Sequence, residues 1–247
     1  MGSRKKITIS WSGGKDAALA LHRLLTQGGY QVDSLHCVFS RETGRVGLHG
    51  VHESLIQQQA DAIGVPLIKS YLASGAGNES YDELMLSVYQ SLRDTGVSHI
   101  AFGDIFLEDI KTYRETLVQK AGLTPLFPLW NIPSEECIRS IVDAGFRVVI
   151  CAANERCFNQ GLMGKEINPE WMPRLPADID PCGENGEFHT FVTDAPYFKS
   201  PVRVDLGRIT TESHTFHTAG NESTVEVISY YQDLLPATEA LNASNSN

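Results

Sequence analysis

The sequence predicts an α/β fold, in which helices cover both faces of a doubly wound parallel sheet, followed by a smaller α+β domain. Three observations carry this prediction. Short apolar runs alternate with amphipathic stretches through the first half of the chain. Glycines follow the amphipathic stretches, as they do at helix C-termini. From residue 187 onward, alternating apolar and polar residues replace the helical period. Repeated strand–helix units build a parallel sheet through right-handed crossovers.

The first half of the chain is interpreted as a series of strand–helix pairs. Each expected strand is a short apolar run, and each expected helix repeats its apolar residues at helical spacing. The expected strands are 7–11, 32–39, 66–70 and 99–102. The expected helices are 16–25, 52–63, 81–95 and 107–121, and the last three end before Gly64, Gly96 and Gly122.

Prolines at 125, 128 and 133 predict a connection between two domains. We place the first domain at 1–130 and the second at 131–236. The second domain is expected to begin with a helix over 134–144 and a strand over 146–151, followed by loops and short helices over 154–181 and strands within 187–217. The tail at 237–247 is rich in Asn, Ser and Ala and is expected to be disordered.

Composition excludes several classes of function. The hydrophobic fraction of 42% and the mean hydropathy of -0.17, without an apolar run of membrane-spanning length, argue against a transmembrane protein, and we expect a cytoplasmic one. The net charge of -10 repels phosphate backbones, so general nucleic-acid binding is not expected. The 5 cysteines are odd in number and include no Cys-x-x-Cys, which predicts neither a disulfide framework nor a zinc ribbon.

The strongest motif lies between the first expected strand and the first expected helix. It reads Ser10-Trp11-Ser12-Gly13-Gly14-Lys15-Asp16. The two glycines permit a tight turn that brings backbone N–H groups close to a ligand. Together with the Ser12 hydroxyl and the helix N-terminus, these groups form a candidate phosphate site. Lys15 adds a positive charge, and Asp16 is a candidate magnesium ligand. The alternative is a plain glycine turn with an exposed lysine.

A second motif, Gly103-Asp104 with Glu108 and Asp109 after it, follows the fourth expected strand. Doubly wound sheets bind ligands at the carboxyl ends of their strands. Gly103 lets the backbone approach a nucleotide closely, and Asp104 is placed to bind magnesium or to position a reacting group. The alternative is a set of acids at a helix N-terminus, where the helix dipole favours them.

A third motif covers residues 180–190 and contains Glu184, Glu187 and His189. Two carboxylates and an imidazole suit the binding of ammonium or magnesium, or general-base catalysis on an attacking amine. The alternative is a solvated hairpin tip, because Asn185-Gly186 favours a tight turn.

Taken together, the motifs resemble the diphthine–ammonia ligases, which are N-type ATP pyrophosphatases. The resemblance extends from Ile7 to about Asp205 and rests on five segments. They are 12–16, 59–67, 103–105, 125–130 and 182–190. The enzymes of this family amidate the diphthine carboxyl group on elongation factor 2 with ATP and ammonium.

The resemblance implies that a carboxylate is adenylated, with release of pyrophosphate, and that ammonium then displaces AMP. It implies ATP and Mg2+ as cofactors, the metal being held by Asp16 and Asp104. The residues expected to bind ATP are Ser10, Ser12, Gly13, Gly14, Lys15, Asp16 and Gly103. The residues expected to be catalytic are Lys15, Asp104, Glu184, Glu187 and His189.

The chain departs from the family in 107–115, which lacks a basic Tyr-Gln-Arg-x-Arg run, so the acceptor carboxylate stays open. Two other functions also stay open. The same ATP chemistry serves sulfur transfer to a tRNA base, and a related domain can be a nucleotide sensor without chemistry. A strand edge in the β-rich C-terminal region is a candidate surface for a homodimer.

Overall fold

The computed structural model describes residues 4–159, 161–168, 170, 175–217 and 224–237. A parallel sheet occupies the first half of the chain, with strand order β3-β2-β1-β4-β5. Its strands are β1 (Lys5–Ser10), β2 (Tyr30–Ser40), β3 (Leu67–Leu72), β4 (His99–Ala101) and β5 (Thr124–Leu126). The chain runs outward from β1 to β3, returns to β4 beside β1 and then continues to β5. This order confirms the predicted doubly wound sheet and places its switch point between β1 and β4.

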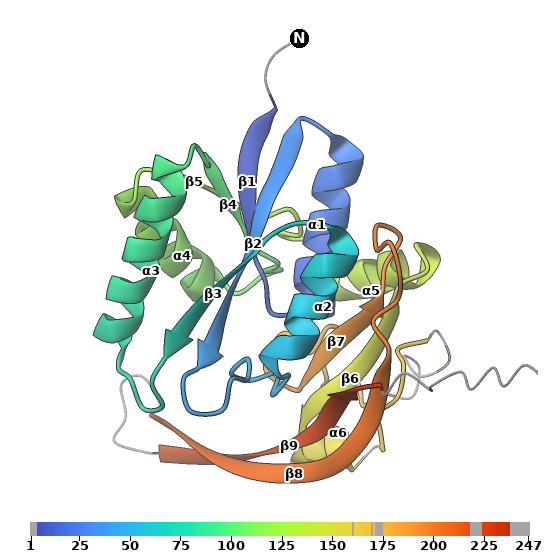
Figure 1. The fold of residues 1–247 in the computed structure, drawn as a ribbon. Helices are drawn as coiled ribbons and strands as arrows, with labels where there is room; N and C mark the ends of the chain where they lie inside the picture. Colours follow the sequence, from blue (N-terminus) through green and yellow to red (C-terminus); the bar gives the residue numbers. More distant parts are fainter. Residues whose placement is uncertain (1–3, 160, 169, 171–174, 218–223, 238–247) are drawn as a thin grey trace, which may run out of the picture.

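Two pairs of helices cover opposite faces of this sheet, as Figure 1 shows. One pair is α1 (Lys15–Gln27) and α2 (Glu53–Ile63), and the other is α3 (Asn78–Asp94) and α4 (Glu108–Lys120). The glycines predicted to end three helices, Gly64, Gly96 and Gly122, all have positive φ angles between 79° and 91°. These helix ends are therefore confirmed.

The second sheet is antiparallel, with strand order β7-β6-β9-β8. Its strands are β6 (Arg147–Asn154), β7 (Phe188–Asp194), β8 (Val204–His217) and β9 (Thr224–Pro236). The helices α5 (Ser134–Asp143) and α6 (Glu155–Phe158) flank β6 in the sequence. The long β8–β9 hairpin curves across the bottom of the molecule in Figure 1, below the carboxyl ends of the parallel strands. The ends of β1 and β4 therefore face the second sheet.

One cluster of buried apolar side chains joins the two sheets. It includes Ile9 of β1, Leu21 of α1, Ile138 of α5 and Phe191 of β7. A separate cluster packs α3 and α4 against the other face of the parallel sheet. Full burial of one such side chain contributes about 1.5–3 kcal/mol. The apolar face of α1 is thus covered by elements of the second half of the chain.

Two strands differ from expectation. Residues 124–126 form β5 rather than part of a connection, and they pair with β4. Because β5 is the edge strand, Pro125 is tolerated there without a backbone N–H. The strand β9 was not expected, and it pairs with both β6 and β8. Of the tail predicted to be disordered, all but Ala237 lies outside the described residues.

Among the residues that the structure describes, no helix is both long enough and apolar enough to cross a bilayer. All five cysteines are buried, and each is a free thiol.

Candidate active site at the carboxyl edge of the parallel sheet

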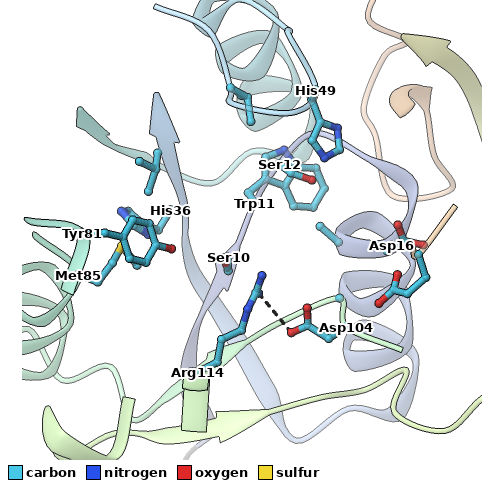
Figure 2. Close-up of a pocket in the computed structure, with 15 residues that line it drawn as sticks. Ser10, Trp11, Ser12, Asp16, His36, His49, Tyr81, Met85, Asp104 and Arg114 are labelled. Atoms are coloured by element: carbon cyan, nitrogen blue, oxygen red, sulfur yellow. Dashed lines mark ion pairs between the residues drawn. The ribbon is translucent and has the colours of Figure 1, made fainter. Parts of the chain in front are cut away.

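A first pocket of about 270 Å³ opens where β1 and β4 end. It is lined by Ser10, Trp11, Ser12, Asp16, Ala17, His36, Val38, Val46, His49, Tyr81, Met85, Gly103, Asp104, Arg114 and Glu184. In Figure 2, Tyr81 and Met85 lie on one side of this pocket and Asp16 lies on the opposite side. Arg114 and Asp104 meet between them. The predicted ligand position at the carboxyl ends of the first and fourth strands therefore coincides with a pocket.

Residues 10–14 form the turn between β1 and α1, which we call the glycine loop. Gly13 has a φ of 83°, in the left-handed region that favours glycine. A Cβ atom at Gly13 would lie 2.5 Å from Cδ1 of Ile56. The carbonyl oxygen of Gly13 accepts hydrogen bonds from the Val192 N–H at 2.9 Å and from Nε2 of Gln59 at 3.0 Å. The turn is therefore held from outside, by α2 and by β7 of the second sheet.

The N-terminus of α1 is also capped from the second sheet. Gly14 occupies the N-cap position and has no side chain to offer. The N–H of Lys15 instead donates to Oγ1 of Thr190 at 3.1 Å. The Thr190 carbonyl accepts a hydrogen bond from Nδ1 of His49 at 3.0 Å. The His49 ring covers Gly14, where a Cβ atom would lie 2.6 Å from Cε1.

Lys15, the first residue of α1, is buried and does not line the first pocket. Its amine donates to Oδ2 of Asp16 at 2.8 Å and to the Cys182 carbonyl, and it lies 5.5 Å from the centre of the Phe188 ring. Burial lowers the pKa of Lys15, but the charge of Asp16, the nearby Cys182 and Glu184, and the hydrogen bond to Asp16 together raise the pKa above its ordinary value. The sequence predicts that this amine contacts a phosphate directly, but in the structure it contacts Asp16 and the Cys182 carbonyl instead.

Asp16 and Asp104 both line the first pocket, and their negative charges repel each other. Oδ1 of Asp16 and Oδ2 of Asp104 are buried without a hydrogen-bond partner. Asp104 forms an ion pair with Nη1 of Arg114 at 3.2 Å, although this contact lacks hydrogen-bond geometry. Burial raises the pKa of Asp104, and the charge of Asp16 adds to the rise while Arg114 opposes it. Carboxylate oxygens in this state suit a cation that they share with a ligand.

Glu184 links the first pocket to a second one. Its Oε1 accepts a hydrogen bond from the Ile105 N–H at 3.2 Å. Burial, and then the charge of Asp16, raise its pKa to about 7. The same side chain lines a second pocket of about 500 Å³. A carboxyl group with such a pKa can exchange a proton near neutral pH.

The second pocket lies between the 180–190 segment, β6 and β9. Its lining residues are Leu48, Ala152, Ala153, Asn154, Glu184, Asn185, Gly186, His189, Ser229 and Tyr231. No lysine or arginine is among these described lining residues. The ring centres of His189 and His49 are 4.8 Å apart. Burial lowers the pKa of His189, and the neighbouring His49 lowers it further, so the imidazole is neutral near pH 7.

Glu187 lines neither pocket. Its Oε1 accepts hydrogen bonds from the Asp180 N–H at 3.0 Å and from Nδ2 of Asn185 at 3.1 Å, and its Oε2 accepts from the Asn185 N–H at 2.9 Å. The side chain is buried and fixes the turn that carries Glu184. Its carboxylate is therefore not brought together with the other predicted catalytic groups.

The structure brings most of the predicted site residues to one place. Those that line the first pocket are Ser10, Ser12, Asp16, Gly103, Asp104 and Glu184. Three polar residues of the site were given no function from the sequence, namely Gln59, Arg114 and Thr190. The sequence does mark Gln59 as unusual, because it is a polar residue on the apolar face of α2, beside Leu55 and Ala60. Its hydrogen-bond partners, Trp11, Gly13 and Val192, are far from it in sequence, so no local pattern predicts them.

Comparison with known proteins gives consistent matches along the chain. Residues 5–125 match the family model of the diphthamide synthase N-terminal domain, and residues 133–224 match that of the C-terminal domain. A diphthine–ammonia ligase from Rattus norvegicus is 25% identical over 228 residues, covering 82% of this chain and 84% of the relative. The protein of that name from Homo sapiens is 24% identical over 229 residues, with the same two shares. In Schizosaccharomyces pombe the identity is 23% over 210 residues, 77% of this chain but 34% of the relative.

Proposed function

The chain belongs to the diphthamide synthase family, and from that premise we propose that it is an ATP-dependent ligase that joins ammonium to a carboxylate acceptor. The acceptor we propose is diphthine on elongation factor 2, since the relatives carry the name diphthine–ammonia ligase. The observation that carries the proposal is the joining of two pockets by one titratable carboxyl group, that of Glu184.

We place ATP in the first pocket. The glycine loop and the N-terminus of α1 supply the backbone N–H groups that suit a pyrophosphate. Val38, Tyr81 and Met85 supply an apolar and aromatic surface that suits a purine base. ATP is larger than this pocket alone, so we expect part of it to extend toward the second pocket past Glu184.

Magnesium fits the residues that are present. The two buried carboxylate oxygens without hydrogen-bond partners, on Asp16 and Asp104, are the kind of ligand this ion takes together with phosphate oxygens and water. Bound by them, magnesium would supply positive charge next to the departing pyrophosphate. Arg114, paired with Asp104, is a second source of positive charge at the same place.

We place the acceptor carboxylate and ammonium at the second pocket. An oxygen of the carboxylate attacks the α-phosphorus, the bond to pyrophosphate breaks, and an acyl adenylate forms. Ammonia then attacks the acyl carbon, and AMP leaves with the bonding electron pair. Glu184 in its ionised form attracts ammonium, and the neutral His189 imidazole can accept a proton from it. Among its described lining residues, the second pocket has no lysine or arginine that would compete with ammonium.

The proposal is tested with elongation factor 2 purified from cells that lack their own ligase. The protein is incubated with this acceptor, ATP, magnesium and isotopically labelled ammonium, and the acceptor is analysed by mass spectrometry. The proposal expects labelled nitrogen in the diphthine side chain, and no label when ATP is left out. If labelled nitrogen never enters the acceptor while AMP still forms with a cell extract, the reaction class stands and the acceptor is wrong.

A further inference from the structure

Gln59 of α2 bonds to three groups on two other elements. Its side chain is fully buried. Its Oε1 accepts a hydrogen bond from Nε1 of Trp11 at 2.8 Å. Its Nε2 donates to the carbonyl oxygen of Gly13 at 3.0 Å and to that of Val192 at 2.7 Å. One amide therefore connects the glycine loop to β7 of the second sheet.

Packing does not explain an amide at this position. Gln59 lies in the apolar stripe of α2, where a methionine would fill a similar volume without polar groups. Burial of an amide is unfavourable unless its hydrogen bonds are made. Here the amide oxygen has a donor and both amide hydrogens have acceptors, so the side chain is satisfied by these three partners alone.

The Gly13 carbonyl is the part of the glycine loop whose direction matters most. The peptide between Gly13 and Gly14 is planar and trans, so its N–H points opposite to its carbonyl. Hydrogen bonds from Gln59 and from the Val192 N–H fix the carbonyl. They thereby also fix the Gly14 N–H, which points to Oγ of Ser12 at 3.3 Å. Ser12 lines the first pocket.

We propose that Gln59 is a positioning residue that holds the glycine loop in the shape that binds the β- and γ-phosphates of ATP. This inference rests on the proposed function, because it takes ATP as the ligand of the first pocket. Gln59 does not line that pocket, so it acts through the Gly13–Gly14 peptide. It follows that the affinity for ATP depends on Gln59 more strongly than the affinity for AMP, which lacks both outer phosphates.

The test uses Gln59→Met, which keeps the side-chain volume and removes all three hydrogen bonds. The matched control is Gln57→Met on the same helix, because among the described residues the Gln57 amide bonds to Asp61 alone, on the exposed face. Affinities for ATP and AMP are measured by titration calorimetry in the presence of magnesium. We expect Gln59→Met to weaken ATP binding about tenfold or more and AMP binding less than about threefold. The control should leave both affinities unchanged.

An unchanged ratio of the two affinities in Gln59→Met would overturn the inference, including the case in which both fall equally. If that variant does not fold, Thr190→Val replaces it. Thr190→Val keeps the shape of the side chain and removes the acceptor of the Lys15 N–H, so the end of the loop loses one hydrogen bond to β7 while the bond between Gly13 and Val192 stays. It should reproduce the selective loss of ATP affinity, and an unchanged ratio would again overturn the inference. If the unaltered protein binds AMP but shows no ATP binding, the proposed function fails instead.

Discussion

Glu184 is the residue whose environment most directly links structure to chemistry. Its folded-state pKa of about 7 lies above the ordinary value of 4.5 because burial favours the neutral carboxyl form. The folded protein therefore binds this proton more tightly than the unfolded chain does. The associated stability is fully present below about pH 4.5 and is lost as the pH rises through about 7. Its size is at most about 3 kcal/mol.

Glu184→Gln should remove this pH dependence, because glutamine keeps the shape and cannot ionise. We expect the melting temperature of the variant, relative to the unaltered protein, to rise between about pH 5 and about pH 8. Thermal unfolding followed by circular dichroism measures it. Glu79→Gln, at an exposed site on α3, is the control for the loss of one carboxylate. A melting-temperature difference that stays constant over this pH range would show that Glu184 does not titrate as described.

At the residue scale, sequence patterns located the loop and the acids better than they assigned roles. Asp16, Asp104 and Glu184 line the same pocket. Asp16 lies in the first turn of α1 and Asp104 follows β4, as predicted, whereas Glu184 lies in the turn before β7. Lys15 and Glu187 were expected to face the substrates, yet both are buried among backbone partners. The Cys182 carbonyl, which binds the Lys15 amine, is 167 positions away and leaves no mark in the local sequence of Lys15, whereas the partners of Glu187 are the nearby Asp180 and Asn185.

At the element scale, the site depends on the close approach of β4 to α1. A Cβ atom on Gly103 would lie 2.6 Å from the carbonyl carbon of Asp16 and 2.7 Å from the Ala17 nitrogen. Both are backbone atoms, so neither can move without shifting the first turn of α1. Gly103 therefore packs a strand end against a helix end, and this packing brings Asp104 toward Asp16.

Gly103→Ala should destabilise the protein and disturb the first pocket together. Overpacking of this kind costs about 1–3 kcal/mol, and the melting temperature of a chain this long falls by about 2–4 °C per kcal/mol. Gly77→Ala is the matched control, since a Cβ atom there has no neighbour within 4 Å. A Gly103→Ala protein as stable as the control would refute the close packing of β4 on α1.

Elements with strong local signals were predictable, and elements defined by distant pairing were not. The strands β1 and β2 and the helices α1 to α4 were predicted within a few residues. The spacing of apolar residues indicates each of these elements, and the glycines that follow the helices indicate the same helix ends. The strand β5 has only three residues and contains Pro125, so its pairing with β4 outweighed a local turn signal. The strand β9 pairs with its sequence neighbour β8 and also with β6, which precedes it by many residues.

At the scale of the whole molecule, one buried cluster unites the two sheets, and the glycine loop lies at their junction. Ile9 and Phe191 belong to the same cluster although they come from different sheets. The Arg45–Asp233 ion pair, at 2.8 Å, adds a second connection between the β2–α2 loop and β9. It is partly exposed and is worth at most about 1 kcal/mol, so the shared core dominates.

We therefore expect the molecule to unfold in one cooperative transition. Urea unfolding would be followed by tryptophan fluorescence, which includes Trp11 at the junction, and by far-ultraviolet circular dichroism, which reports on all elements. The two curves should coincide. Two separated transitions would mean that the sheets have independent cores.

The central claim is that this pocket cleaves ATP between the α- and β-phosphates to activate a carboxylate. The most direct measurement follows ATP labelled at its α-phosphate, with magnesium, ammonium and diphthine-bearing elongation factor 2. The account predicts labelled AMP that forms only when the acceptor is present, and a large loss of that product in Asp104→Asn. Labelled ADP, or tight ATP binding without any turnover, would contradict it and would favour a nucleotide sensor.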